Sequence, residues 1–60
     1  MSHKNLVGRR AYGISSKGEK IIGEIIETCY DDEITIYPDG ETGSVDETAW
    51  RFKYDKITLI

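Results

Sequence analysis

The sequence has few of the residues from which very small proteins build covalent or metal supports. Cys29 is the only cysteine in 60 residues, so no internal disulfide can form. His3 is the only histidine, and one thiol with one imidazole cannot build a Cys/His zinc site. A chain of this size makes one domain, residues 1–60, and buries only about 60% of the surface that its unfolded form exposes. Oligomerisation is the remaining support, so we expect a homodimer.

Long apolar runs and catalytic motifs are also missing. No segment approaches the roughly 20 apolar residues of a membrane-spanning helix, and the N-terminus lacks the apolar part of a secretory signal. There is no Gly-x-Ser-x-Gly, phosphate-loop or His-Glu-x-x-His motif, and a Cys29 nucleophile would have only His3 as its base. We expect a non-enzymatic protein without cofactor or metal, and the unpaired thiol indicates the cytoplasm.

Basic residues are absent from the middle of the chain. Residues 1–20 carry five Lys/Arg and one Glu, residues 21–47 carry nine Asp/Glu and no Lys or Arg, and residues 48–60 return to a small positive balance. The net charge of −3 therefore hides an uneven distribution. This asymmetry predicts one acidic and one mildly basic surface if the fold keeps the segments apart.

What the chain does have is an isoleucine-rich segment at residues 20–30, which we expect to form a long strand. Ile21 and Ile25 would share one face of that strand, while Ile22 and Ile26 would share the other. The same spacing also fits one stripe of an amphipathic helix, but β-branched residues and the interior Gly23 favour the strand. One isoleucine pair can line the core. The other needs either a sharp bend at Gly23 or a partner to cover it.

Turn residues divide the rest of the chain into short extended pieces. We expect strands at residues 6–14, 33–37, about 42–46 and 56–60, with residues 1–5 frayed. Pro38-Asp39-Gly40 is the strongest turn signal. Residues 48–54 alternate like a strand, although residues 45–48 could open one helical turn near residues 46–50. The expected interior residues, besides one isoleucine pair, are Ile34, Ile36, Val45, Trp50, Phe52, Ile57 and Leu59.

Five short strands at this spacing predict an all-β fold, a small five-stranded SH3-like barrel. In layout the chain resembles barrels of the Tudor, KOW and Sm type, through Val7-Gly8, Gly23-Glu24-Ile25, Asp39-Gly40 and Val45. Tudor-like domains end their third strand with Tyr-x-Val-x-Phe-Asp-Asp-Gly. Counted back from Gly40, Tyr37 falls on the Phe position, but Thr35 and Glu33 fall on the apolar positions. The resemblance therefore implies the architecture and no Tudor ligand site.

The surplus apolar surface points to function by contact. Exposed apolar patches mark interfaces, and each buried isoleucine is worth about 1.5–3 kcal/mol. We expect a module that binds and modulates a partner protein, as an accessory or inhibitor protein does. Chains this short are typical of phage-encoded accessory proteins. The candidate partner-binding residues are Ile21, Ile25, Tyr12, Tyr37 and Tyr54.

Three alternatives stay open. A nucleic-acid-binding barrel would use Lys/Arg of residues 4–20 and 51–56, with candidate phosphate contacts at Arg9, Arg10, Lys17 and Lys20. An acidic mimic of nucleic acid would block a DNA-handling protein through Asp31, Asp32, Glu33, Asp39, Glu41, Asp46 and Glu47. An aromatic-cage reader would need convergence among Tyr12, Tyr30, Tyr37 and Tyr54. In residues 50–54, alternation should place the cations and the aromatics on opposite faces.

Overall fold

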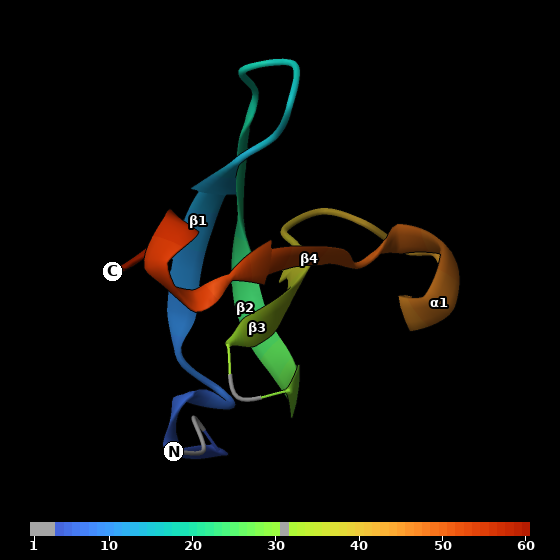
Figure 1. Ribbon diagram of the computed structural model, residues 1–60. Coiled ribbons are helices and arrows are strands. Elements are labelled where there is room, and N and C mark those ends of the chain that lie inside the picture. The colour runs from blue at the N-terminus through green and yellow to red at the C-terminus, as the bar shows by residue number, and fades with distance from the viewer. Residues whose placement is uncertain (1–3, 31) are drawn as a thin grey trace.

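The computed structural model describes residues 4–30 and 32–60, and in this part of the chain five antiparallel strands make one sheet (Figure 1). The strands are β1 (Arg10–Ile14), β2 (Lys20–Tyr30), β3 (Glu33–Pro38), β4 (Trp50–Lys53) and β5 (Ile57–Leu59). Three short helical elements accompany them: the 3₁₀ turn η1 (Lys4–Leu6) precedes β1, the single α-helical turn α1 (Val45–Thr48) lies between β3 and β4, and the 3₁₀ turn η2 (Tyr54–Lys56) joins β4 to β5. The strand order is β4-β3-β2-β1-β5. The sheet curls into a half-barrel, which confirms the predicted all-β, five-stranded, SH3-like class.

Strand β2 makes the curl possible because it belongs to both halves of the sheet. Its first part pairs with β1 and its second part with β3, and the register with β3 shifts between Ile25 and Glu27. That shift leaves Ile26 as the extra residue of a bulge, which bends the strand. Gly23 lies just before it, where a methyl group would come within 2.0 Å of the carbonyl oxygen of Tyr37. The strand was predicted from the sequence, and a bend was one of two alternatives, expected at Gly23; the register shifts lie further along, between Ile25 and Tyr30.

The core is small and lies on the concave side of the half-barrel. Its buried members are Leu6, Ala11, Ile25, Ile34 and Ile36, against which Phe52 and Ile57 pack. The side chain of Phe52 reaches across the half-barrel from β4 to β1, since a methyl group at position 13 would lie 2.8 Å from its ring. Glycine at that position therefore leaves the space that the ring fills.

The register decides which isoleucines face inward. Ile25 lies opposite Ile36 and is fully buried, while Ile21 lies opposite Gly13 on the same concave face and is half-buried. Ile22 lies opposite Tyr12 on the convex face. Because β2 is a strand, the helical alternative for residues 19–30 is wrong.

Several predicted boundaries are corrected by the structure. The first strand begins at Arg10 instead of residue 6, and part of the segment expected to fray forms η1, which carries the core residue Leu6. No strand forms at residues 42–46. There the helical turn α1 begins after Ser44, whose hydroxyl donates a hydrogen bond of 2.8 Å to the carboxylate of Glu47. This Ser-x-x-Glu spacing is a helix-start signal that outweighed the extended reading of the segment.

Candidate interaction surface

The concave face of the half-barrel opens to solvent where its two outermost strands leave the core uncovered. The residues around this opening, here called the barrel mouth, come from β4, η2 and β5: Trp50, Phe52, Tyr54, Ile57 and Leu59. In the described residues, β4 pairs only with β3, and β5 pairs only with β1. The sheet therefore ends on both sides of the mouth, and η2 is the short link between them (Figure 1).

Neighbouring side chains connect the members of the barrel mouth. The rings of Trp50 and Phe52 stack with centroids 6.3 Å apart and planes 11° apart. Phe52 and Ile57 pack against the same core cluster. Tyr54, Ile57 and Leu59 line one hollow of about 410 Å³ together with Asp55 and Thr58. The core therefore lies between the aromatic pair on β4 and the hollow beside β5.

The large side chains of the mouth are much more exposed than core residues. Trp50 is 40% exposed, Tyr54 is 42% exposed and Leu59 is 37% exposed, whereas Ile25, Ile34 and Ile36 are 0% exposed. The prediction that Trp50 and Leu59 line the interior is therefore wrong, and so is that for Val45, which is 47% exposed. The strand positions of Trp50 and Leu59 face the concave side as expected, but the sheet is too short to close over them.

The convex face carries a smaller apolar patch among charged residues. Tyr12 and Ile22 are cross-strand neighbours on β1 and β2, and Ile14 is exposed beside Lys20. The ammonium group of Lys20 lies 4.4 Å from the centroid of the Tyr12 ring, within the range of a cation–π contact. The ammonium group of Lys20 thus lies over one face of the Tyr12 ring.

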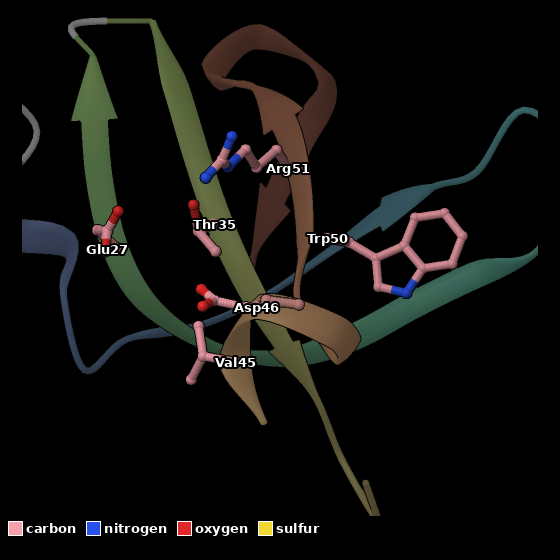
Figure 2. A pocket seen from close by; sticks show the side chains of 7 residues that line it. Glu27, Thr35, Val45, Asp46, Trp50 and Arg51 are labelled. Carbon is pink, nitrogen blue, oxygen red and sulfur yellow. The ribbon is translucent and has the colours of Figure 1, made fainter. Parts of the chain in front are cut away.

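A second hollow, of about 430 Å³, lies on the convex side of β2, β3 and β4 beside α1. Figure 2 shows the side chains of Glu27, Asp46 and Arg51 directed towards it. Thr35 lies at its base and is only 4% exposed. In the same view Trp50 points to the opposite side of β4 from Arg51, as the alternation of residues 50–54 predicted.

An ion pair joins the start of β1 to the turn after β3. Both terminal nitrogens of Arg10 donate hydrogen bonds to the carboxylate of Asp39, one of them at 3.0 Å. This hydrogen bonding holds the pKa of Asp39 below its ordinary value and raises the pKa of Arg10. The pair is solvent-exposed, so its electrostatic gain is screened.

A second ion pair joins the end of β4 to the turn before β3. The ammonium group of Lys53 donates a hydrogen bond to Asp32 at 3.2 Å and lies 3.9 Å from a carboxylate oxygen of Glu33. The hydrogen bond to Asp32 is the main reason that the pKa of Lys53 is raised. The backbone N–H of Tyr54 also donates to the carbonyl of Asp32 at 2.6 Å, which fixes the entrance to η2.

The structure separates the five predicted partner-binding residues. Ile25 is fully buried in the core and a partner cannot reach it, and Ile21 is half-buried on the concave face. Tyr12 and Tyr37 lie on the convex side, where the hydroxyl of Tyr37 donates to the carbonyl of Gly43 at 2.6 Å. Only Tyr54 belongs to the barrel mouth.

The predicted charged sets are also divided. Among the acidic residues, Asp39 pairs with Arg10, and both Asp32 and Glu33 pair with Lys53. The carboxylate of Glu47 accepts a hydrogen bond from Ser44, and Asp46 lines the second hollow. Glu41 is exposed, and Asp31 lies outside the described residues. Among the candidate phosphate contacts, Arg10 and Lys20 share the convex face of β1 and β2, Lys17 lies in the turn between these strands, and Arg9 precedes β1. Two of these four cations already contact Asp39 or the Tyr12 ring.

The tyrosines that the structure describes do not converge on one cage. Tyr12 and Tyr37 face the convex side from different strands, Tyr54 lies at the mouth, and the side chain of Tyr30 lies outside the described set. Sequence reasoning missed Trp50 and Leu59 as surface residues. The signal that could have found them is the shortness of the strands at both ends of the predicted order.

Comparison with protein families, with curated proteins and with solved structures finds no match to this chain. Within residues 4–30 and 32–60, no helix has the length and apolar character needed to cross a membrane. Nor does this described region bring three or more His, Cys, Asp or Glu side chains into a metal-holding group.

Proposed function

We propose that this protein is a non-catalytic interaction module of the cytoplasm that binds a partner protein through the barrel mouth and thereby modulates it. The observation that carries the proposal is the exposure of Trp50, Tyr54 and Leu59 at the barrel mouth, where Trp50 stacks on Phe52 and the other two line the hollow of about 410 Å³. Aromatic residues are enriched at protein interfaces and supply most of the large binding contributions, about 2 kcal/mol or more each. An apolar side chain of a partner that packed against Trp50 and Phe52 would extend the core on the β4 side, where the half-barrel leaves it open.

Binding of nucleic acid is less favoured by the same geometry. Stacking on bases and neutralising phosphates must happen on one surface, with cations flanking the aromatic rings. Here Arg51 faces away from Trp50, and Lys53 is engaged with Asp32. An acidic mimic needs many unpaired carboxylates on one face, whereas Asp39 is neutralised by Arg10.

The test is a comparison of three tagged proteins as bait in extract of the producing cells. We expect wild type to retain a specific partner and Trp50→Ala to lose it, because Trp50 is a large exposed aromatic on the β4 side of the mouth. Ile14→Ala is the matched control: Ile14 is 52% exposed, but on the convex face, so the partner should be retained. Binding is then measured with purified partner, where Trp50→Ala should weaken affinity by at least about tenfold.

Two results would count against the proposal. One is equal loss of the partner with Trp50→Ala and Ile14→Ala, which would move the contact away from the mouth. The other is recovery of nucleic acid alone, with retention that disappears steeply as salt rises, which is the behaviour of phosphate contacts. Circular dichroism of each bait confirms that the variant is folded before it is used.

A further inference from the structure

The two edges of the sheet differ in how they are protected. An edge strand presents unpaired N–H and C=O groups, and natural proteins block such edges with charged side chains or with short or covered strands. Strand β4 carries Arg51 and Lys53, and α1 lies just before it. Strand β5, Ile57–Leu59, carries no charged side chain. Strand β5 is therefore the edge that no charged side chain protects.

The space beside β5 is open along the strand. The hollow of about 410 Å³ is lined by the consecutive residues Ile57, Thr58 and Leu59. Consecutive residues of a strand point to opposite faces of the sheet, so a hollow that touches all three opens onto the edge itself. In the described chain, β5 ends the strand order and β1 is its one neighbour.

The side-chain pattern of β5 is symmetric about its middle residue. If a second copy pairs antiparallel with Thr58 opposite Thr58, Ile57 of each copy lies opposite Leu59 of the other. Apolar pairs then meet on the concave face and two hydroxyl side chains meet on the convex face, both of which are favourable cross-strand pairs. A shift by one residue would place Ile57 opposite Thr58 and join the concave face of one copy to the convex face of the other.

Charge favours β5 over β4 as the edge strand that pairs with a second copy. The same two-fold arrangement of β4, centred on Phe52, would place Arg51 of one copy opposite Lys53 of the other. Like charges directly opposite each other destabilise a strand pair. Pairing of β5 brings no like charges together between residues 57 and 60.

We propose that two copies of this chain associate through antiparallel pairing of their β5 strands, centred on Thr58. This inference rests on the proposed function, in which the barrel mouth is the binding surface, and it assigns the β5 side of that mouth to a second copy. The pairing joins two five-stranded sheets into one and covers Leu59, which is 37% exposed in the single protomer. Trp50 lies on β4 and stays available, so each copy in the dimer keeps the β4 side of its mouth open to a partner.

The test uses charge at the two-fold axis. Thr58 is exposed, so Thr58→Lys and Thr58→Glu leave the protomer folded while placing like charges opposite each other in the dimer. The oligomeric state is measured by sedimentation and light scattering across the micromolar range, with Thr42→Lys as the control for an added lysine at an exposed position away from β5. Like charges facing each other across an interface should weaken the dimer by at least about tenfold.

We expect wild type and Thr42→Lys to dimerise, and each Thr58 variant alone to be monomeric. Mixing the Thr58→Lys and Thr58→Glu proteins should restore a one-to-one dimer, visible by native mass spectrometry. Wild type that stays monomeric, a Thr58→Lys protein that dimerises as well as wild type, or a mixture that stays monomeric would each overturn the inference. Recovery of the partner protein distinguishes a failure of the dimer proposal from a failure of the proposed function. Thr58→Lys keeps Trp50 and should still retain the partner protein, whereas Trp50→Ala should still dimerise.

Discussion

Replacement of Gly23 by alanine should disrupt the bend on which the half-barrel depends. The added methyl group would lie 2.0 Å from the carbonyl oxygen of Tyr37, 2.7 Å from its carbonyl carbon and 2.9 Å from Cα of Pro38. All three atoms belong to the backbone of β3, so no side-chain rotation can relieve the overlap. Ordinary non-bonded contacts between carbon atoms require about 3.5 Å, and β2 and β3 would have to separate by about 1 Å or more.

The energetic consequence is large for a protein of this size. Overpacking a well-fitted position costs about 1–3 kcal/mol, and a backbone collision belongs at the upper end of that range. A domain of 60 residues has only about 3–5 kcal/mol of stability from its core. Each kcal/mol lowers the melting temperature of such a small domain by about 4–8 °C. Gly23→Ala should therefore melt about 10–20 °C below wild type.

Thermal unfolding followed by circular dichroism and by the fluorescence of Trp50 measures this effect. Gly18→Asn is the matched control, because Gly18 has φ of 87° with open space around the added carbon, and asparagine tolerates this conformation better than most residues. The control should lose about 5 °C or less. A Gly23→Ala protein that melts within about 3 °C of wild type would refute the close approach of β2 to β3 and with it this account of the curl.

Two further predictions concern the core and the exposed ion pair. Ile25→Ala should lower the free energy of unfolding by about 2–5 kcal/mol and leave the protein largely unfolded. Ile22→Ala changes a half-buried position on the convex face and should cost clearly less. Urea unfolding measures both variants, and equal losses of stability would contradict the assignment of Ile25 to the core. Arg10 lowers the pKa of Asp39 in the folded state. Between the lowered pKa and the ordinary one, the unfolded chain therefore binds more protons than the folded chain. The stability that this pair contributes is present above the ordinary pKa near 4 and is lost as pH falls through the lowered pKa. A carbon-detected NMR titration should show Asp39 ionising at lower pH in wild type than in Arg10→Gln, and identical midpoints would remove the pairing as the cause.

Local patterns determined the parts of this fold whose partners are close in sequence. The alternation of Ile34 and Ile36 and the β-branched run around Gly23 were sufficient to predict β3 and β2, whereas the bend within β2 was only one of two alternatives. The turn at Pro38-Asp39-Gly40 was equally readable, since Gly40 adopts φ of 83°. These features depend on backbone preferences and on the two-residue period of a strand, which the chain carries in its own order.

Only the tertiary structure decided which apolar residues stay in water. The pattern of residues 50–59 gives the face on which Trp50 and Leu59 lie, but not whether anything covers that face. Cover depends on how far the sheet curls and on where its edge strands end, and both depend on the register between strands distant in sequence. In a chain of 60 residues the sheet ends before it closes, and that geometry leaves Trp50 and Leu59 exposed at the mouth while Ile25 is buried.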